Sequence, residues 1–526
     1  MRQRRSAIWV CGLLLLVGAL RAAAASEEAA AKRVAQNARE EAKRTGFKLE
    51  YGELLPVLTP EEQSRAAVIT NAGFALRPLR LTQSLKWMEP MARGAARCGW
   101  QSEGKWNEVA GELETIAAPL DAAAEILQAD RPLRFVVGPS LLLPHLAGLK
   151  SLANAFTARM ALALRDGNTA EAWTNLLAVT ALAIRYDPEP AEVSHLVRAG
   201  LVQQAFVATW EALQTNVWTD TQLGDLSGQW ARVDVFRGVP DTAMLQAAQL
   251  LTYTAAVRGE YLTNHVVTPE LSRLGRSSLT EPGRAWNEFR DLVHYAASQK
   301  DYARKGSYLD EVLIIRFYQK RAGELRRAIG QTNWLAMRPL PGVTNHNFLS
   351  LTTNTPSHLQ SLVNSREIMM ATSLYASGGG ANTALGRLVE TEARRRVLLT
   401  ALAVQREHLR QGQPPKSLAD VPGAVRDFIT GDPLRYRVET NGSVVLYSPG
   451  VDTEDNGGEM LPTKIGEIRS AAKADLVWPR MATATDSMRL GRDRGSAPDI
   501  DPVSGNFRPA VQSTPEPDDN DPDDPP

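Results

Sequence analysis

The sequence of 526 residues is poor in cysteine and in aromatic side chains, and it carries no excess of either charge. Only two cysteines are present, and Cys11 lies in a leading segment that is predicted to be removed, so no intrachain disulfide is expected. The remaining Cys98 is predicted to be a small buried side chain rather than a reactive thiol. Because 59 basic residues balance 59 acidic ones, nothing in the composition indicates a nucleic-acid partner.

Long apolar runs are also lacking. The longest, residues 8–20, has about 13 residues, fewer than the roughly 20 that span a bilayer. Three arginines precede it and small alanines follow it, which predicts a secretory signal over residues 1–25. We therefore expect a periplasmic or secreted protein, with a membrane contact only if residues 8–20 stay uncleaved and anchor the chain to the inner membrane.

The common signatures of catalysis are missing from the sequence. It has no His-Glu-x-x-His zinc motif, no Gly-x-Ser-x-Gly elbow, no phosphate-binding loop and no dinucleotide fingerprint. The seven histidines are too far apart in sequence to form a helical metal pair. Glu260, Glu311 and Glu324 lie on predicted helices, but the sequence does not bring any two of them together. We therefore predict no catalytic and no cofactor-binding residue.

What the sequence does contain is helix-forming periodicity, because alanine and leucine abound. Thr59, Pro60 and Glu62 form a capping signature at a helix start. Two helices are predicted over residues 147–164 and from Thr169 to just before Asp187, with a turn between them. This hairpin resembles one tetratricopeptide repeat, although no copy follows about 34 residues later. Further helices are predicted over residues 26–45 (exposed), from 191 onward, over 241–261 and over 308–335.

The predicted fold is mainly α: a multi-helix bundle with tetratricopeptide-like hairpins and a small C-terminal α+β module, a long helix plus a β-hairpin. Trp87, Trp100 and Trp106 lie in a polar, glycine-containing stretch and are predicted to anchor the core, with a carbohydrate platform as the alternative. The predicted parts are a signal (1–25), a helical body (26–337), an inter-lobe loop and helix (338–383), the α+β module (384–470) and a disordered acidic tail (491–526).

The C-terminal module has a recognisable order of residue types. A leucine-bearing helix ends at Gly412, Pro415 and Leu418 follow, and Asp432-Pro433 leads into two strands joined at Asn441-Gly442. This order resembles the globular part of type II secretion pseudopilins, over about a seventh of the chain. Over the whole chain, the order of signal, helical body and module also resembles uncharacterised secreted proteins of Planctomycetes and Verrucomicrobia.

The pseudopilin resemblance implies a calcium site in the final Gly- and Asp-rich loop, formed by Asp452, Glu454 and Asp455. Clustered carboxylates and backbone carbonyls are the ligands that calcium prefers. The alternative is a solvated acidic turn that closes the hairpin.

Three hypotheses on function follow. The first is a non-catalytic envelope or secreted binding or scaffold protein with a protein partner in the cell envelope. The second is a hydrolase acting on envelope polymers, and the third is an accessory component of type II secretion or a pilus-like system. A deep pocket with two facing acids would favour the hydrolase.

Overall fold

The computed structural model is mainly α-helical, as the sequence predicts. The residues that it describes are 25–76, 82, 85–91, 94–136, 143–263, 300–344, 384–440, 442–460 and 474–482. The predicted signal (up to residue 24), most of the inter-lobe segment (345–383) and the acidic tail (491–526) lie outside these residues. Within the described residues, no helix is both long enough and apolar enough to cross a membrane.

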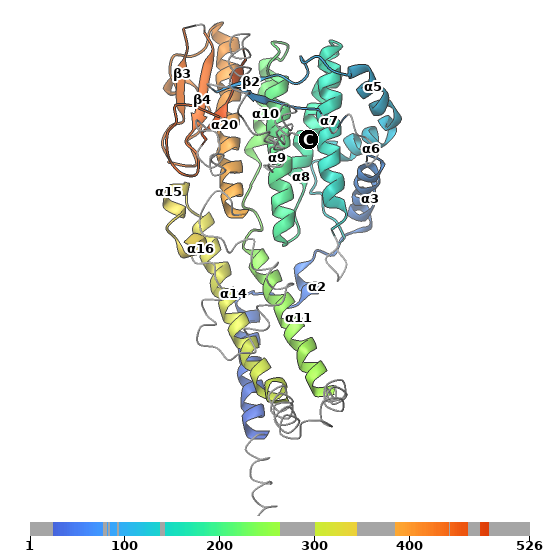
Figure 1. Ribbon diagram of the computed structural model, residues 1–526, viewed down its shortest axis with the longest axis vertical. Helices are drawn as coiled ribbons and strands as arrows, with labels where there is room; N and C mark the ends of the chain where they lie inside the picture. The colour runs from blue at the N-terminus through green and yellow to red at the C-terminus, as the bar shows by residue number, and fades with distance from the viewer. Residues whose placement is uncertain are drawn as a thin grey trace, which may run out of the picture.

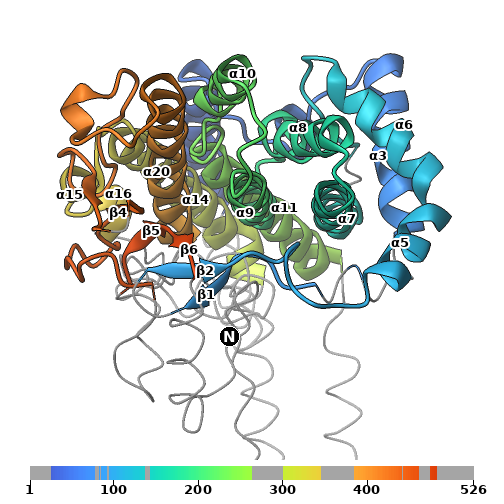
Figure 2. The same cartoon turned by 90° about the horizontal axis from the view of Figure 1, so that it is seen from above.

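The described helices form a head and a stalk (Figure 1). The stalk combines the N-terminal helix (residues 25–44) with α11 (Asp241–Thr263) and α14 (Ser307–Ile329). Seen from above, the head helices form an arc, with α20 (Ala384–Gln411) and the sheet that follows it in the chain at one end (Figure 2). The arc's other end is made by α3 (Pro60–Ala75), α5 (Trp106–Thr115) and α6 (Ala117–Gln128).

Three helices make the centre of the head: α7 (His145–Arg165), α8 (Thr169–Arg185) and α9 (Glu192–Ala212). The predicted hairpin is thus confirmed, with its turn at Gly167, whose φ of 74° is the left-handed conformation that glycine adopts easily. The capping box at Thr59 is present at the start of α3.

Two glycines set the contact between α3 and α7. A Cβ added to Gly73 would lie 2.6 Å from the Cα of Gly148, so the two backbones approach more closely than any side chain would allow. This crossing brings α3 onto the central helices and places its buried Ile69 in the main core.

The long helix α20 belongs to the head rather than to a separate module. It packs on α9 and on α10 (Asp220–Ala231), and its Leu388, Leu398 and Leu402 lie in the same core cluster as α7 to α9. Arg406 and Arg410 also form ion pairs with Asp220 at the start of α10, at 2.7 and 3.0 Å. The helix ends at Gly412, as predicted, with φ 73°.

One sheet completes the C-terminal part. Strands β3 (Arg435–Val438), β4 (Val444–Ser448) and β5 (Leu476–Trp478) are antiparallel in that order, after the short helix η2 (Leu418–Asp420). The predicted hairpin is therefore present as β3 and β4. Strand β5 lies beyond residue 470, where the module was expected to end, so the sheet includes residues that the sequence pattern left out.

A second sheet joins distant parts of the chain. Strands β1 (Glu89–Met91) and β2 (Ala95–Arg97) form a hairpin, and β6 (Arg480–Met481) pairs with β2 in parallel. Beside it, the indole N–H of Trp210 donates to the Pro479 carbonyl at 2.7 Å. The end of the described chain is thereby fastened to the N-terminal half of the head.

Two expectations for the stalk are corrected in part. The helix expected over residues 26–45 is exposed at most positions, but Ala31, Ala35, Ala38 and Ala42 are buried along one face. The last three lie in a core cluster with residues of α11 and α14, because alanines allow close packing. The helix expected over residues 308–335 ends at Ile329. The short helices α15 (Trp334–Met337) and α16 (Pro341–Thr344) follow. The short helix α2 (Tyr51–Leu54) and the π-helix η1 (Tyr302–Gly306) complete the stalk.

The break after Ile329 has a tertiary cause. The side chain of Asn333 accepts from the backbone N–H of Ala336 and starts α15. The Trp334 backbone then donates to the Phe428 carbonyl and its indole N–H donates to the Val451 carbonyl, at 2.7 and 2.9 Å. These bonds to the C-terminal part outweigh the helical periodicity of the sequence.

Candidate functional site

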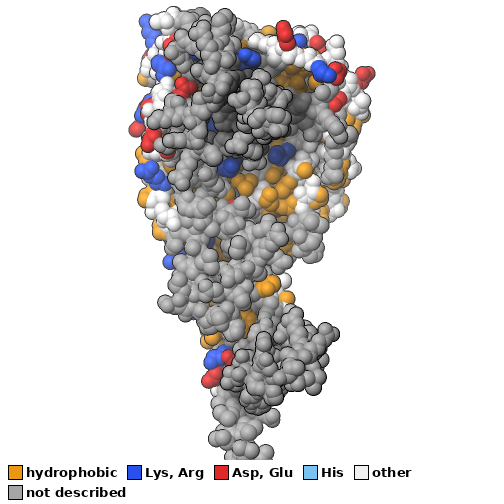
Figure 3. Space-filling model, in the orientation of Figure 1, with side chains coloured by type: hydrophobic (Ala, Val, Ile, Leu, Met, Phe, Trp, Pro, Cys, Tyr) orange, Lys and Arg blue, Asp and Glu red, His pale blue; other side chains and the backbone are white. Residues whose placement is uncertain are grey.

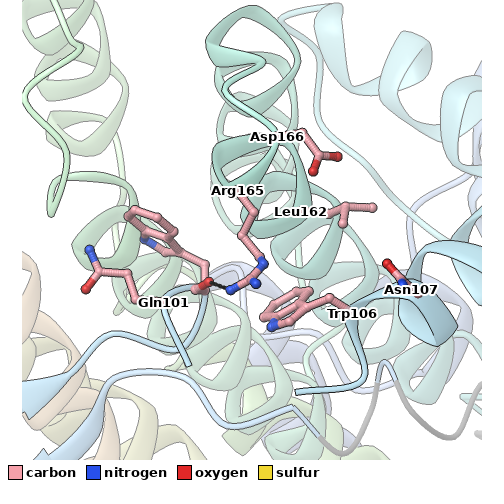
Figure 4. A pocket seen from close by; sticks show the side chains of 7 residues that line it. Gln101, Trp106, Asn107, Leu162, Arg165 and Asp166 are labelled. Carbon is pink, nitrogen blue, oxygen red and sulfur yellow. Dashed lines mark hydrogen bonds between the residues drawn. The ribbon is translucent and has the colours of Figure 1, made fainter. Parts of the chain in front are cut away.

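A cleft of about 390 Å³ lies on the head where the start of α5 faces the end of α7 (Figure 4). Figure 4 shows Arg165 reaching down toward Trp106, with Leu162, Asp166 and Asn107 on one side and Gln101 on the other. The lining residues are Trp100, Gln101, Trp106, Asn107, Leu162, Arg165 and Asp166.

Arg165 is held in place by the chain around the cleft. One guanidinium nitrogen, Nη1, donates to the carbonyls of Trp100 and Ser102 at 2.5 and 3.2 Å. The guanidinium carbon lies 4.9 Å from the centre of the Trp106 ring, a cation–π distance. The Trp106 indole N–H in turn donates to the Ser102 carbonyl at 3.1 Å. The floor of the cleft is therefore rigidly connected to α7.

The three tryptophans of this stretch differ in their exposure. Trp87 and Trp106 are 9% and 6% exposed and pack against each other at 6.3 Å, so they anchor the core. Trp100 is half-buried, and its indole N–H donates to the Glu211 carbonyl at 3.0 Å while the residue lines the cleft. Trp100 is thus the member of the three that a ligand can reach.

A buried carboxylate fixes the loop behind the cleft. Glu211 on α9 accepts from the backbone N–H groups of Met88 and Gly99, at 2.6 and 2.9 Å, and from the Cys98 thiol at 2.8 Å. Burial raises the pKa of Glu211 and, together with this neighbouring carboxylate, raises the pKa of the Cys98 thiol far above its ordinary value. The expectation of a buried Cys98 is confirmed. Sequence reasoning missed Glu211 because the loop that it holds precedes it by more than a hundred positions.

Two carboxylates of the predicted calcium loop, those of Asp452 and Asp455, accept hydrogen bonds from other groups of the protein. Asp455 accepts from the Tyr447 hydroxyl at 3.0 Å, from the Gly457 N–H at 2.9 Å and from Arg435 at 3.2 Å. Burial opposes ionisation of Asp455, but these donors outweigh it and lower its pKa. Asp452 accepts from the backbone N–H of Glu454 at 3.2 Å, and the Glu454 side chain is exposed.

A fourth acid, which sequence reasoning missed, takes part in closing this loop. Asp475 accepts from the N–H groups of Asn456 and Gly458, at 3.1 and 2.7 Å, and lies just before β5. Among the described residues, no three His, Cys, Asp or Glu side chains are grouped as metal ligands. The calcium role of Asp452, Glu454 and Asp455 stays a prediction.

A buried polar cluster lies where α8 passes into α9. His145 Nε2 is 2.9 Å from a carboxylate oxygen of Glu189, whose other oxygen accepts from the Tyr186 hydroxyl at 2.8 Å. The His145 ring stacks on Phe135 at 4.1 Å. Burial opposes ionisation of Glu189, but the contact with His145 outweighs it and lowers the pKa of this carboxyl. The cluster holds the start of α7 against the α8–α9 connection.

Further polar side chains of this region lie on α9 and are more than nine-tenths buried: Glu192, Ser194, His195 and Arg198. Burial, aided by the nearby Arg198, lowers the pKa of His195 to about 4, so that this ring is neutral at pH 7. Burial also raises the pKa of Glu192 to about 8, against the opposing charge of Arg321.

Two of the helix carboxylates considered for an acid–base pair, Glu311 and Glu324, make other contacts in the described structure. Glu311 pairs with Arg39 at 2.8 Å and with Arg258, which ties the N-terminal helix to α11 and α14. Glu324 lies 3.7 Å from Lys320 on the same helix. The side chain of Glu260 lies outside the described residues. The structure therefore does not bring Glu311 and Glu324 together as a pair.

Charges of both signs are interspersed over the described surface of the head that Figure 3 shows, without a patch of one sign. Comparison of the chain with family models, with curated proteins and with solved structures gave no match.

Proposed function

We propose that this chain is a non-catalytic binding protein of the cell envelope or of the secreted fraction, and that the cleft at Arg165 is its ligand site. The observation that carries the proposal is the chemistry of the cleft wall. It combines a fixed guanidinium, amide side chains, one carboxylate and a half-buried indole at an open surface. Such a mixture of donors and acceptors suits recognition.

The hydrolase alternative is less well supported by this cleft. Asp166 is the one carboxylate among its lining residues, whereas hydrolysis of a polymer by paired acids needs two, placed on either side of the bond that breaks. Two buried acids of the head, Glu189 and Glu211, are occupied by hydrogen bonds that hold the fold. An accessory role in secretion rests on the module's resemblance alone and stays a second proposal.

The test compares the mature chain, residues 26–526, with a cleft variant carrying Asn107→Ala and Asp166→Asn. Both side chains are exposed, so the fold should be unaffected. Each purified protein is mixed with insoluble envelope material, and the sedimented fraction is measured. We expect the wild type to co-sediment and the cleft variant to lose most of this retention, with no soluble products released.

A matched control carries the same chemical changes elsewhere on the head, Asn216→Ala and Asp225→Asn, at two exposed positions outside the cleft. It should co-sediment like the wild type. Equal retention of the cleft variant and the control would contradict the proposal, and release of soluble fragments by the wild type would favour the hydrolase.

A further inference from the structure

The wall of the cleft offers hydrogen-bond donors and acceptors side by side. The amides of Gln101 and Asn107 each both donate and accept, the Asp166 carboxylate accepts, and the Arg165 guanidinium donates. A hydroxyl group also donates and accepts, so neighbouring hydroxyls of one ligand match planar amide and carboxylate groups well. The cleft is therefore complementary to a polyhydroxylated molecule.

The charges of the cleft argue against an anionic ligand. Arg165 and Asp166 contribute one charge of each sign, and both side chains are exposed. Nη1 of Arg165 is already engaged by the carbonyls of Trp100 and Ser102, and its guanidinium lies against the Trp106 ring. No unopposed positive charge is left in the cleft, as a phosphate or a carboxylate would require.

The apolar part of the wall is small and consists of indole and leucine surface. Trp100 is half-buried at the cleft, Trp106 is almost covered, and Leu162 is partly exposed. An acyl chain would need an enclosed apolar wall to leave water, and this cleft is open. An indole beside polar groups instead suits a molecule with one apolar face of C–H groups and polar edges.

We propose that the cleft binds a neutral saccharide, so that the ligand of the function proposed above is the glycan part of an envelope or extracellular polymer. This inference rests on that proposed function and names its ligand class. The volume of about 390 Å³ is at the lower end of the range of small-molecule sites, about 300–1,000 Å³, which suits a short stretch of sugar rings. The residues that would recognise it are Gln101, Asn107, Arg165 and Asp166, with Trp100 as the apolar contact.

The experiment is calorimetric titration of the mature chain with soluble hexasaccharides. The neutral probes are β-1,4-linked N-acetylglucosamine and β-1,3-linked glucose, the anionic probe is an α-1,4-linked galacturonate of equal length, and a neutral hexapeptide serves as the peptide probe. We expect a neutral hexasaccharide to bind. Because hydroxyl recognition does not depend on charge screening, its affinity should stay constant between low and high salt.

The cleft variant Asn107→Ala/Asp166→Asn should bind that hexasaccharide about tenfold more weakly or worse, since the Asn107 amide is removed and the Asp166 acceptor loses its charge. The matched Asn216→Ala/Asp225→Asn control should bind like the wild type. Unchanged affinity in the cleft variant would overturn the placement of the sugar in this cleft.

Two further outcomes separate this inference from the proposed function. If only the peptide or the galacturonate binds, and the cleft variant still loses co-sedimentation, the saccharide inference is overturned while the binding function stands. If the cleft variant co-sediments like the wild type and no probe binds, both are overturned.

Discussion

At the scale of single residues, the buried carboxyl groups of the head differ in the hydrogen-bond partners that offset the cost of their burial. Glu211 accepts three hydrogen bonds and Glu189 contacts a histidine and a tyrosine. Glu192 has no hydrogen-bond partner for either carboxylate oxygen among the described residues, although it is only 8% exposed. A buried carboxyl group without hydrogen-bond partners is more stable in its protonated form than in its ionised form.

This placement predicts a pH dependence. The folded Glu192 carboxyl keeps its proton up to about pH 8, whereas the ordinary pKa is 4.5, so between these values the unfolded state binds fewer protons. The free energy of unfolding should therefore fall as the pH rises through this window. Glu192→Gln, which cannot ionise, should be more stable than the wild type at pH 7, on the order of 1–3 kcal/mol, and equal to it near pH 4.5.

Denaturant unfolding at several pH values measures this difference. Glu114→Gln on α5 is the control, because that side chain is exposed and its substitution should leave the profile unchanged. A Glu192→Gln profile parallel to that of the wild type would show that Glu192 ionises normally in the folded protein.

At the scale of elements, the arrangement of α3 and α7 depends on the absence of two side chains. Backbone atoms of Gly148 lie within 3.1 Å of the position that a Gly73 Cβ would take, and neither backbone can move without shifting a whole helix. In the sequence, Gly73 is only one small residue in the helical stretch that follows the capping signature at Thr59. Its structural reason becomes visible only when the two helices are placed side by side.

We predict that Gly73→Ala lowers the free energy of unfolding by about 1–3 kcal/mol, the usual cost of overpacking. Gly111→Ala is the matched control, because nothing lies within 4 Å of a Cβ there and alanine favours the helix by about 1 kcal/mol. Thermal unfolding followed by circular dichroism compares the two. Equal midpoints for Gly73→Ala and the wild type would mean that the helices separate without cost.

At the scale of the whole molecule, the described chain returns to where the head begins. Strand β6 pairs with β2, the Trp210 indole donates to Pro479, and Trp478 packs edge-on against Phe206 at 5.5 Å. Together with α20 in the main core, these contacts make the C-terminal part an integral layer of the head. A C-terminal module that folded independently of the head would not make these contacts.

This arrangement predicts that a chain ending at residue 473 is less stable than one ending at residue 482. The longer chain keeps β5 and β6, whereas the shorter one leaves Trp210 and the edge of β4 without partners, at a cost of several kcal/mol. The midpoint of thermal unfolding measures the difference, with the full chain as reference for residues 483–526. Identical midpoints for the two truncated chains would show that β5 and β6 do not stabilise the head.

The sequence by itself determined the features that depend on neighbouring residues. The mainly α class, the capping box at Thr59, the turn at Gly167 and the end of α20 at Gly412 are all local matters of periodicity, side-chain capping and backbone freedom, and each is present in the structure. The burial of Trp106 and Cys98 also followed from residue type.

The tertiary structure alone decided which distant residues meet. The sequence predicted Trp100 as a core anchor or a platform, but the cleft also needs Arg165 and Asp166, which come from the far end of α7. Glu211 at the two ends of the β1–β2 hairpin, Asp475 beside the predicted calcium loop and β6 beside β2 are likewise contacts across long stretches of chain. Their partners are set by how helices and strands pack, and no local pattern records that packing.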